Sequence, residues 1–196
     1  MRTCPPLVVL ACLSIGSVTA EESALRFVDL RVQGGVAVND GEAASLTIMA
    51  GDIGNKDQHV ITIDADMGIV IGIRGQVAKV TADFEKIPGD IDVKLGGGTF
   101  LGGLGFYLGK NSHAELLAGY STGIGSSTGS TPFEERDIRY YQYLGELGWY
   151  YTWSTHVQVG ITAGYSVMKI TYKADAGDEK AKADGVDAAL SLGYRF

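Results

Sequence analysis

The chain ends in Asp184-Gly185-Val186-Asp187-Ala188-Ala189-Leu190-Ser191-Leu192-Gly193-Tyr194-Arg195-Phe196. From Val186 to Phe196 the even-numbered positions carry apolar side chains, and the odd-numbered positions between them carry small or charged ones. Strict alternation predicts a β-strand whose two faces meet different surroundings. The apolar face reaches an aromatic residue at the final position, where a strand of a solvated sheet would normally lead into a polar tail. The stretch therefore predicts the closing strand of a sheet that has one wholly apolar face.

Seven earlier segments repeat this alternation. The expected strands span residues 25–38, 43–51, 59–80, 95–108, 113–124, 138–151, 157–172 and 184–196. No apolar run reaches the roughly 20 residues that a membrane-spanning helix requires, and only helices and closed barrels satisfy every backbone group inside lipid. The sequence thus predicts an all-β fold, an eight-stranded antiparallel up-and-down transmembrane β-barrel.

Two places leave alternatives open. Residues 59–80 alternate far enough for one long strand or for two strands with a turn at 64–68, and one strand is adopted because bacterial barrels have an even strand count. At Met168 the apolar residues move to even positions, continuing with Ile170 and Tyr172. That change of phase indicates either a β-bulge or the edge of the membrane.

Outer-membrane barrels have short periplasmic turns and long external loops. The later connections follow this rule, because 109–112 and 152–156 are short while 123–137 and the charged segment 174–183 are long. Pro88-Gly89 marks the tip of a further hairpin at 81–95. The first hairpin departs from the rule, because its connection 39–42 is short and the next, 51–58, is longer.

The second face of the strands is too polar for a dry protein core. Unpaired buried charges cost several kcal/mol each, whereas the lumen of a glycine-rich barrel can hold charges that pair with one another. The apolar face is therefore expected to face lipid, and the polar face the lumen. The residues expected to form a lumen network are Arg31, Arg74, Glu115, Glu146 and Asp187.

Aromatic residues lie near both ends of the predicted strand 138–151. The ten residues from Tyr141 to Tyr151 rise about 24 Å at a strand tilt of about 45°, close to the apolar band of roughly 25 Å in such barrels. This spacing predicts aromatic girdles at the two membrane interfaces. The expected girdle residues are Tyr141, Tyr143, Trp149, Tyr151, Trp153, Tyr194 and Phe196.

The N-terminus has the features of a Sec-type secretory signal peptide, residues 1–20. Arg2 supplies the positive end, 7–16 the apolar core, and Val18-Thr19-Ala20 the cleavage site. Both cysteines lie inside this segment, so the barrel domain, residues 21–196, is expected to contain no disulfide. The net charge of −7 and the scattered basic residues argue against nucleic acid as a partner.

Nearly all of the mature chain resembles the small eight-stranded barrels of Gram-negative outer membranes, the OmpX/Ail, OmpA transmembrane-domain and opacity-protein group. The resemblance rests on the architecture and on the ending Ala189-Leu190-Ser191-Leu192-Gly193-Tyr194-Arg195-Phe196. It implies an outer-membrane protein that contacts membrane lipid and lipopolysaccharide and is recognised by the barrel-assembly machinery through its last strand. It also implies a monomer.

Some barrels of this size deacylate or acylate lipid A, so an enzyme is possible. A serine hydrolase needs a histidine beside the serine. The candidate Ser154-x-His156 has the reverse order of the deacylase His-x-Ser pattern, and His59, His113 and His156 share no metal-ligand spacing. We therefore expect no catalytic, cofactor or metal site, and a structural or surface-interaction role. A lipid-modifying enzyme is the alternative, and a narrow channel the third possibility.

A soluble β-sandwich or lipocalin-like barrel would show the same alternation. The two classes differ in which face points outward. Leu104, Ile161 and Leu190 should lie outside in a membrane barrel and at a shared centre in a soluble one, with Arg74 and Glu146 placed the opposite way.

Overall fold

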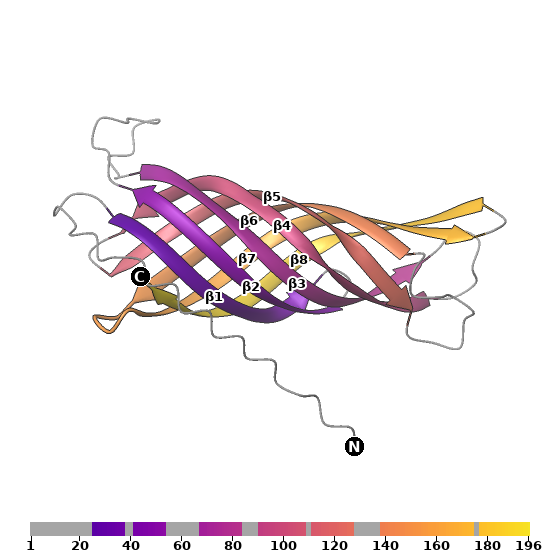
Figure 1. The fold of residues 1–196 in the computed structure, drawn as a ribbon, viewed down its shortest axis with the longest axis horizontal. Helices are drawn as coiled ribbons and strands as arrows, with labels where there is room; N and C mark the ends of the chain where they lie inside the picture. The colour runs from indigo at the N-terminus through magenta and orange to yellow at the C-terminus, as the bar shows by residue number, and fades with distance from the viewer. Residues whose placement is uncertain are drawn as a thin grey trace, which may run out of the picture.

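The computed structural model describes residues 25–37, 41–53, 67–83, 90–108, 111–127, 138–174 and 177–196. These residues form antiparallel strands that pair in sequence order and close into a barrel (Figure 1). The expected eight-stranded all-β fold is confirmed. The predicted signal peptide lies outside the described residues. The strands are β1 (Leu25–Ala37), β2 (Gly41–Ile53), β3 (Met67–Asp83), β4 (Asp90–Tyr107), β5 (Ser112–Ser127), β6 (Ile138–Thr152), β7 (Val157–Ala174) and β8 (Gly177–Arg195).

The register of the ladders fixes how far the strands are staggered. Following the pairing from Arg31 on β1 through β2 to β7 leads to Ala183 on β8. Arg31 itself pairs with Gly193, ten residues further along β8. A stagger of this size tilts the strands by about 40° and leaves an interior just wide enough for side chains to fill. No helix within the described ranges is long and apolar enough to cross a membrane.

Apolar side chains cover the outside of the barrel wall. Leu104, Ile161 and Leu190 are 38%, 54% and 71% exposed, whereas Arg74 and Glu146 are 9% exposed and face the interior. On β7 the outward face is apolar from Val157 to Val167, ten residues or about 25 Å of height at this tilt. That height equals the apolar band of membrane barrels, and the arrangement is the reverse of a soluble barrel.

The strands differ from the expected ranges at their upper ends, away from the C-terminus, and at the start of β3, which lies at the lower end. One strand, β3, lies between β2 and β4, and it begins at Met67, so residues 59–66 of the expected strand lie outside the described residues. The segment 174–183 was expected to be a long charged loop, and this was wrong. There β7 and β8 continue their ladder as far as the pair Ala174–Gly177. The ladder continues because Ala181 and Ala183 pack inside it.

The change of phase at Met168 marks an inversion of wall polarity and not a β-bulge. The ladders on both sides of β7 run through Met168 with one-to-one pairing. Beyond this point Met168 and Ile170 still face inward and are buried, while Lys169 faces outward. The apolar side of the strand therefore switches from the outside of the barrel to the inside, as expected where a barrel leaves a membrane.

Two buried apolar clusters close the interior. The upper cluster fills the part of the barrel beyond the apolar band and consists of Ala37, Val80, Ala82, Val93, Leu95, Ile138, Tyr140, Met168, Ile170, Ala181 and Ala183. The lower cluster lies towards the end that holds the C-terminus and consists of Phe27, Met49, Ile53, Val70, Leu101 and Leu117. Most of the polar side chains of the lumen lie between or beside these clusters.

The upper cluster should behave as a protein core. Ile170→Ala removes a fully buried side chain and should lower the free energy of unfolding by about 2–5 kcal/mol. The neighbouring change Thr171→Ala, on the outer face, should alter it by about 0.5 kcal/mol or less. Denaturant titration of the refolded barrel in detergent measures both. Equal effects would contradict the inverted wall.

Candidate functional site: a closed polar lumen

Arg31 is the centre of the lower charged cluster. Its guanidinium donates to both carboxylate oxygens of Glu115, at 2.8 and 2.7 Å, and to Oδ2 of Asp29 at 2.7 Å. All three side chains are buried. Charge-assisted bidentate pairs of this kind are the strongest hydrogen bonds available to side chains. They compensate the desolvation that burial of these charges requires.

Asp29 also links the first and last strands of the barrel. Arg195 on β8 donates to Oδ1 and Oδ2 of Asp29 at 2.8 and 2.9 Å, and Gln158 donates to Oδ2 at 2.9 Å. Asp29 and Arg195 are also the first register pair of the β1–β8 ladder, which extends only to Val36–Ala188 and is the shortest of the eight ladders. The ion pair therefore strengthens the seam at which the barrel closes.

Aromatic rings and His113 pack around the lower charged cluster. The guanidinium of Arg31 lies 3.8 Å from the centroid of the Tyr150 ring, and that of Arg195 lies 4.3 Å from the Phe27 centroid. His113 stacks on Tyr150, and its Nε2 lies 2.9 Å from Oε1 of Glu115. Glycines make room for the rings, since a Cβ at Gly160 would come within 2.3 Å of the Tyr150 ring.

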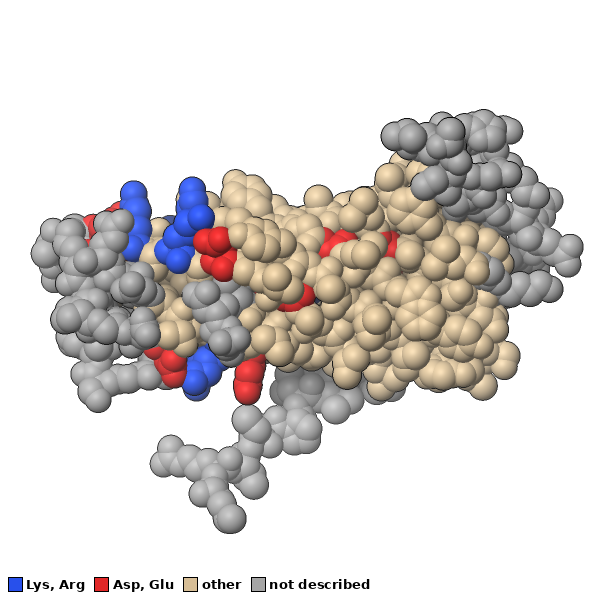
Figure 2. All heavy atoms as spheres, turned by 180° about the vertical axis from the view of Figure 1, so that it is seen from behind, with Lys and Arg blue, Asp and Glu red and all other residues tan. Residues whose placement is uncertain are grey.

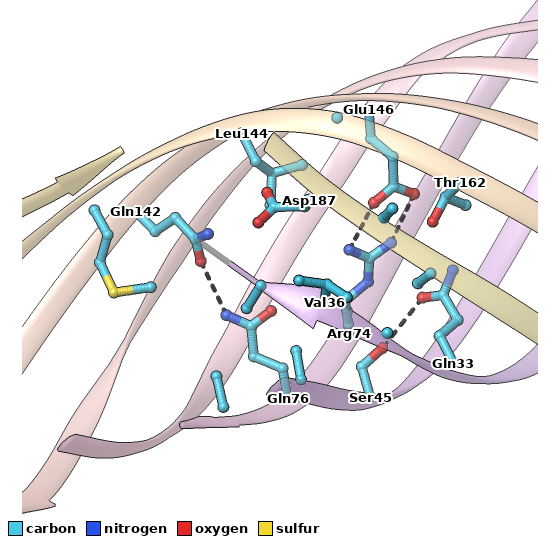
Figure 3. Close-up of a pocket in the computed structure, with 18 of the residues that line it drawn as sticks. Gln33, Val36, Ser45, Arg74, Gln76, Gln142, Leu144, Glu146, Thr162 and Asp187 are labelled. Carbon is cyan, nitrogen blue, oxygen red and sulfur yellow. Dashed lines mark hydrogen bonds and ion pairs between the residues drawn. The ribbon is translucent and has the colours of Figure 1, made fainter. Parts of the chain in front are cut away.

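Arg74 and Glu146 form the second ion pair, nearer the middle of the barrel. The guanidinium donates through Nη1 and Nη2 to the two carboxylate oxygens, at 2.9 Å each (Figure 3). Its Nε donates to Oγ1 of Thr47 at 3.2 Å. Thr47 and Ser45 both donate to Oε1 of Gln33 at 3.1 Å. The hydroxyl of Thr47 thus links the ion pair to the amide above it.

A small cavity lies above this pair. Its volume is about 80 Å³, enough for a few water molecules. Gln76 donates to Oε1 of Gln142 at 3.1 Å across its upper side (Figure 3). Met168 of the upper apolar cluster also lines the cavity. Asp187 lines the cavity together with Arg74 and Glu146. The cavity therefore has a mixed lining, in which alanines, Leu144 and Met168 lie beside the charged and amide side chains.

The structure thus places the five expected network residues in the lumen but divides them between two groups. Arg31 pairs with Glu115, Arg74 pairs with Glu146, and Asp187 lines the cavity next to the second pair. The predicted network did not include Asp29, His113 or Arg195, which the structure places around Arg31 and Glu115. Alternation gives the face of a residue, whereas its partner depends on the stagger between strands.

The expected girdle residues lie on the outside of the wall near its two edges. Trp149, Trp153, Tyr194 and Phe196 are exposed towards the end that holds the C-terminus, and Tyr143 is exposed towards the other end. Tyr141 and Tyr151 are partly buried. Neighbouring rings contact each other, as in Tyr141–Tyr143, Tyr151–Trp153 and Tyr194–Phe196, with centroids 6.3, 5.3 and 5.1 Å apart.

The chemistry of the lumen is that of charge compensation. In the lower charged cluster the guanidiniums of Arg31 and Arg195 face the carboxylates of Asp29 and Glu115. The ring nitrogens of His113 contact Glu115 and Arg195. Within the described ranges, no group of three or more His, Cys, Asp or Glu side chains is arranged to hold a metal ion. The interactions hold strands together across the barrel and fill its cross-section.

The Arg74–Glu146 pair permits a double-mutant test. Arg74→Met and Glu146→Leu should each lower the free energy of unfolding by about 3–5 kcal/mol, because each leaves a buried charge without its partner. The double variant should be much nearer to wild type. Arg26→Met, which breaks an ion pair whose side chains are both 65% exposed, should cost about 1 kcal/mol or less. Additive effects of the two buried substitutions would show that the pair is not coupled.

The seam permits a second test. Arg195→Gln should destabilise the barrel by about 3–5 kcal/mol, because Asp29 stays buried and loses two hydrogen bonds. Arg195→Lys should recover part of the loss, since an ammonium keeps the charge but not the bidentate geometry. Refolding from urea into detergent separates this effect from any role of the last strand in cellular assembly. A wild-type midpoint for Arg195→Gln would show that the pair does not support the seam.

No protein-family model matches the chain, and no curated protein sequence matches it. Solved structures that match include a major outer membrane protein from Thermus thermophilus, at 14% sequence identity and a TM-score of 0.41. The match covers 86% of this chain and 99% of that one. A likeness this distant carries no function across to this chain.

Proposed function

We propose that the chain is an integral outer-membrane β-barrel protein with a closed lumen and a structural or surface-interaction role. The observation that carries the proposal is the inversion of polarity in the wall. An apolar band about 25 Å high surrounds paired charges, and beyond the band the outward face becomes charged while the inward face becomes apolar. Lipid around the band accounts for its apolar outward face, and water around the part beyond the band accounts for the charged outward face there.

The orientation follows from the connections. The C-terminus and the tight turn before β7 lie at one end, which is the periplasmic end in this proposal (Figure 1). The hairpins β3–β4 and β7–β8 then extend from the outer surface of the cell. An adhesive or ligand-binding role belongs to this external part. The closer relation to the OmpX/Ail, OmpA and opacity-protein group stays a proposal that rests on the barrel and on the C-terminal ending.

The filled lumen argues for a barrel that neither conducts nor catalyses. The upper apolar cluster and the two charged groups occupy successive levels of the interior, and an eight-stranded barrel has little room beside its own side chains. His113 is fully buried and hydrogen-bonded to a carboxylate that Arg31 already binds. Both features favour a scaffold over a lipid A-modifying enzyme or a narrow channel.

The location and the fold are tested together. The full chain, expressed in a Gram-negative host, should enter the outer-membrane fraction and migrate faster on a gel unheated than boiled, because a folded barrel resists detergent. Recovery in the soluble periplasmic fraction, with no heat-dependent shift, would overturn the membrane assignment.

The closed lumen predicts that the barrel conducts no ions. Purified barrel in a planar bilayer should give no current steps above those of empty detergent, because the apolar cluster obstructs the path of hydrated ions. Discrete steps from wild-type protein would favour the channel alternative. Incubation with lipopolysaccharide, followed by analysis of released acyl chains, tests the enzyme alternative, and release by the wild-type barrel above that in protein-free detergent would favour it.

A further inference from the structure

The outer wall of β6, β7 and β8 carries a cluster of basic side chains just above the apolar band. Arg139, Lys169, Lys180 and Lys182 face outward here and form what is termed the basic patch. In the register, Tyr141, Lys169 and Lys182 form one row across the three strands. Arg139, Thr171 and Lys180 form the next row above it.

Two features of the patch indicate that it binds an anion. Lys169 and Lys182 are direct cross-strand partners, and like charges in this relation, with side chains about 5 Å apart, destabilise a sheet. The only ion pair of the patch among the described residues joins Lys182 to Asp184, at 3.1 Å. Arg139, Lys169 and Lys180 have no carboxylate within 4 Å in the described part of the chain. The four cations of the patch face two outward carboxylates on β8, Asp178 and Asp184, so positive charge is in excess among the described residues.

The opposite side of the barrel provides a comparison. Lys79 and Lys94 are also direct cross-strand partners at a similar height. There, however, Lys79 bonds to Asp92 at 2.7 Å and pairs in register with Glu42. The ammonium of Lys79 holds the pKa of Asp92 below its usual value, so that carboxylate stays ionised at neutral pH. Two acids balance two lysines on β2–β4, whereas three strands away the cations are in excess.

The wall below the patch suits acyl chains. Tyr143, Tyr165 and Val186 are 57%, 51% and 68% exposed, and the space outside Gly145 is open. Lys169 lies over the ring of Tyr141, with Nζ 5.7 Å from the centroid, which holds the cation at the height of the aromatic girdle. The Lys and Arg side chains visible in Figure 2 also lie towards one end of the barrel. A ligand that contacts both regions has an anionic head and apolar chains.

We propose that the basic patch binds the phosphate groups of lipid A, the lipid part of lipopolysaccharide, in the outer leaflet. The inference rests on the proposed function, because that orientation places the patch at the outer surface. Arg139 supplies a planar donor for a phosphate, and the lysines supply point charges. The acyl chains then lie against Tyr143, Tyr165 and the open space at Gly145.

The test measures binding of diphosphoryl lipid A to purified, detergent-solubilised barrel by native mass spectrometry. Each basic side chain that faces an anionic lipid contributes about a fivefold factor in affinity, so Arg139→Gln/Lys169→Gln should weaken binding about 25-fold. Neither Arg139 nor Lys169 has a carboxylate partner among the described residues, so the double variant should fold. Lys94→Gln, which removes one charge from the balanced side, is the matched control and should leave affinity within about twofold. Lipid A without phosphate groups should bind wild type as weakly as the double variant binds the phosphorylated form.

The outcomes separate this inference from the proposed function. Unchanged affinity in the double variant, or an equal loss in Lys94→Gln, would overturn the patch as the site. Equal affinity of wild type for phosphatidylglycerol and lipid A would overturn the assignment to lipid A. If the heat-dependent gel shift is intact in each case, the barrel and its location stand while the lipid site fails. The single variants Arg139→Gln and Lys169→Gln, at about fivefold each, serve if the double variant lacks the gel shift.

Discussion

Closure of the backbone ladder is the constraint on which the rest of the structure depends. Inside lipid each backbone N–H and C=O must find a partner in the protein, and eight strands meet this requirement only when β8 pairs with β1. The ten-residue stagger that closure imposes then decides which side chains meet inside. Arg31 reaches Glu115, 84 positions along the chain, and Arg74 reaches Glu146, because the stagger brings these residues to related heights.

The interior combines paired charges with close packing of aromatic rings against glycines. Each buried carboxylate of the two ion-pair groups accepts from an arginine with two nitrogens, so the cost of removing it from water is offset locally. Glycines at the wall let the Tyr150 ring lie flat beneath Arg31. The combination fills this part of the lumen with side chains that several partners each hold in place.

Alternation along the chain was sufficient to predict eight strands and the inward face of the five charged residues in the predicted lumen network. It could not predict partners, because the relative height of Asp29, His113 and Arg195 depends on the register between strands far apart in sequence. It also failed at 177–183, where Lys180, Lys182 and two alanines have the composition of a solvated loop. There the inward face needs only small apolar side chains, and charge on the outer face is compatible with water. A strand outside the membrane turns its apolar face inward and its charged face to water, whereas the rest of β8 turns its apolar face outward.

The inversion of wall polarity at Met168 also determines how deeply the molecule sits. Sinking by two residues would carry Lys169 into hydrocarbon, and rising by two would expose Val167 to water, so both displacements are opposed. The immersion depth is thereby fixed to within about one residue pair. From Lys169 to the last pair of the hairpin, Ala174–Gly177, the strand climbs five residues, or about 12 Å at this tilt. The last described pair of the hairpin is consequently held at a set elevation above the apolar band.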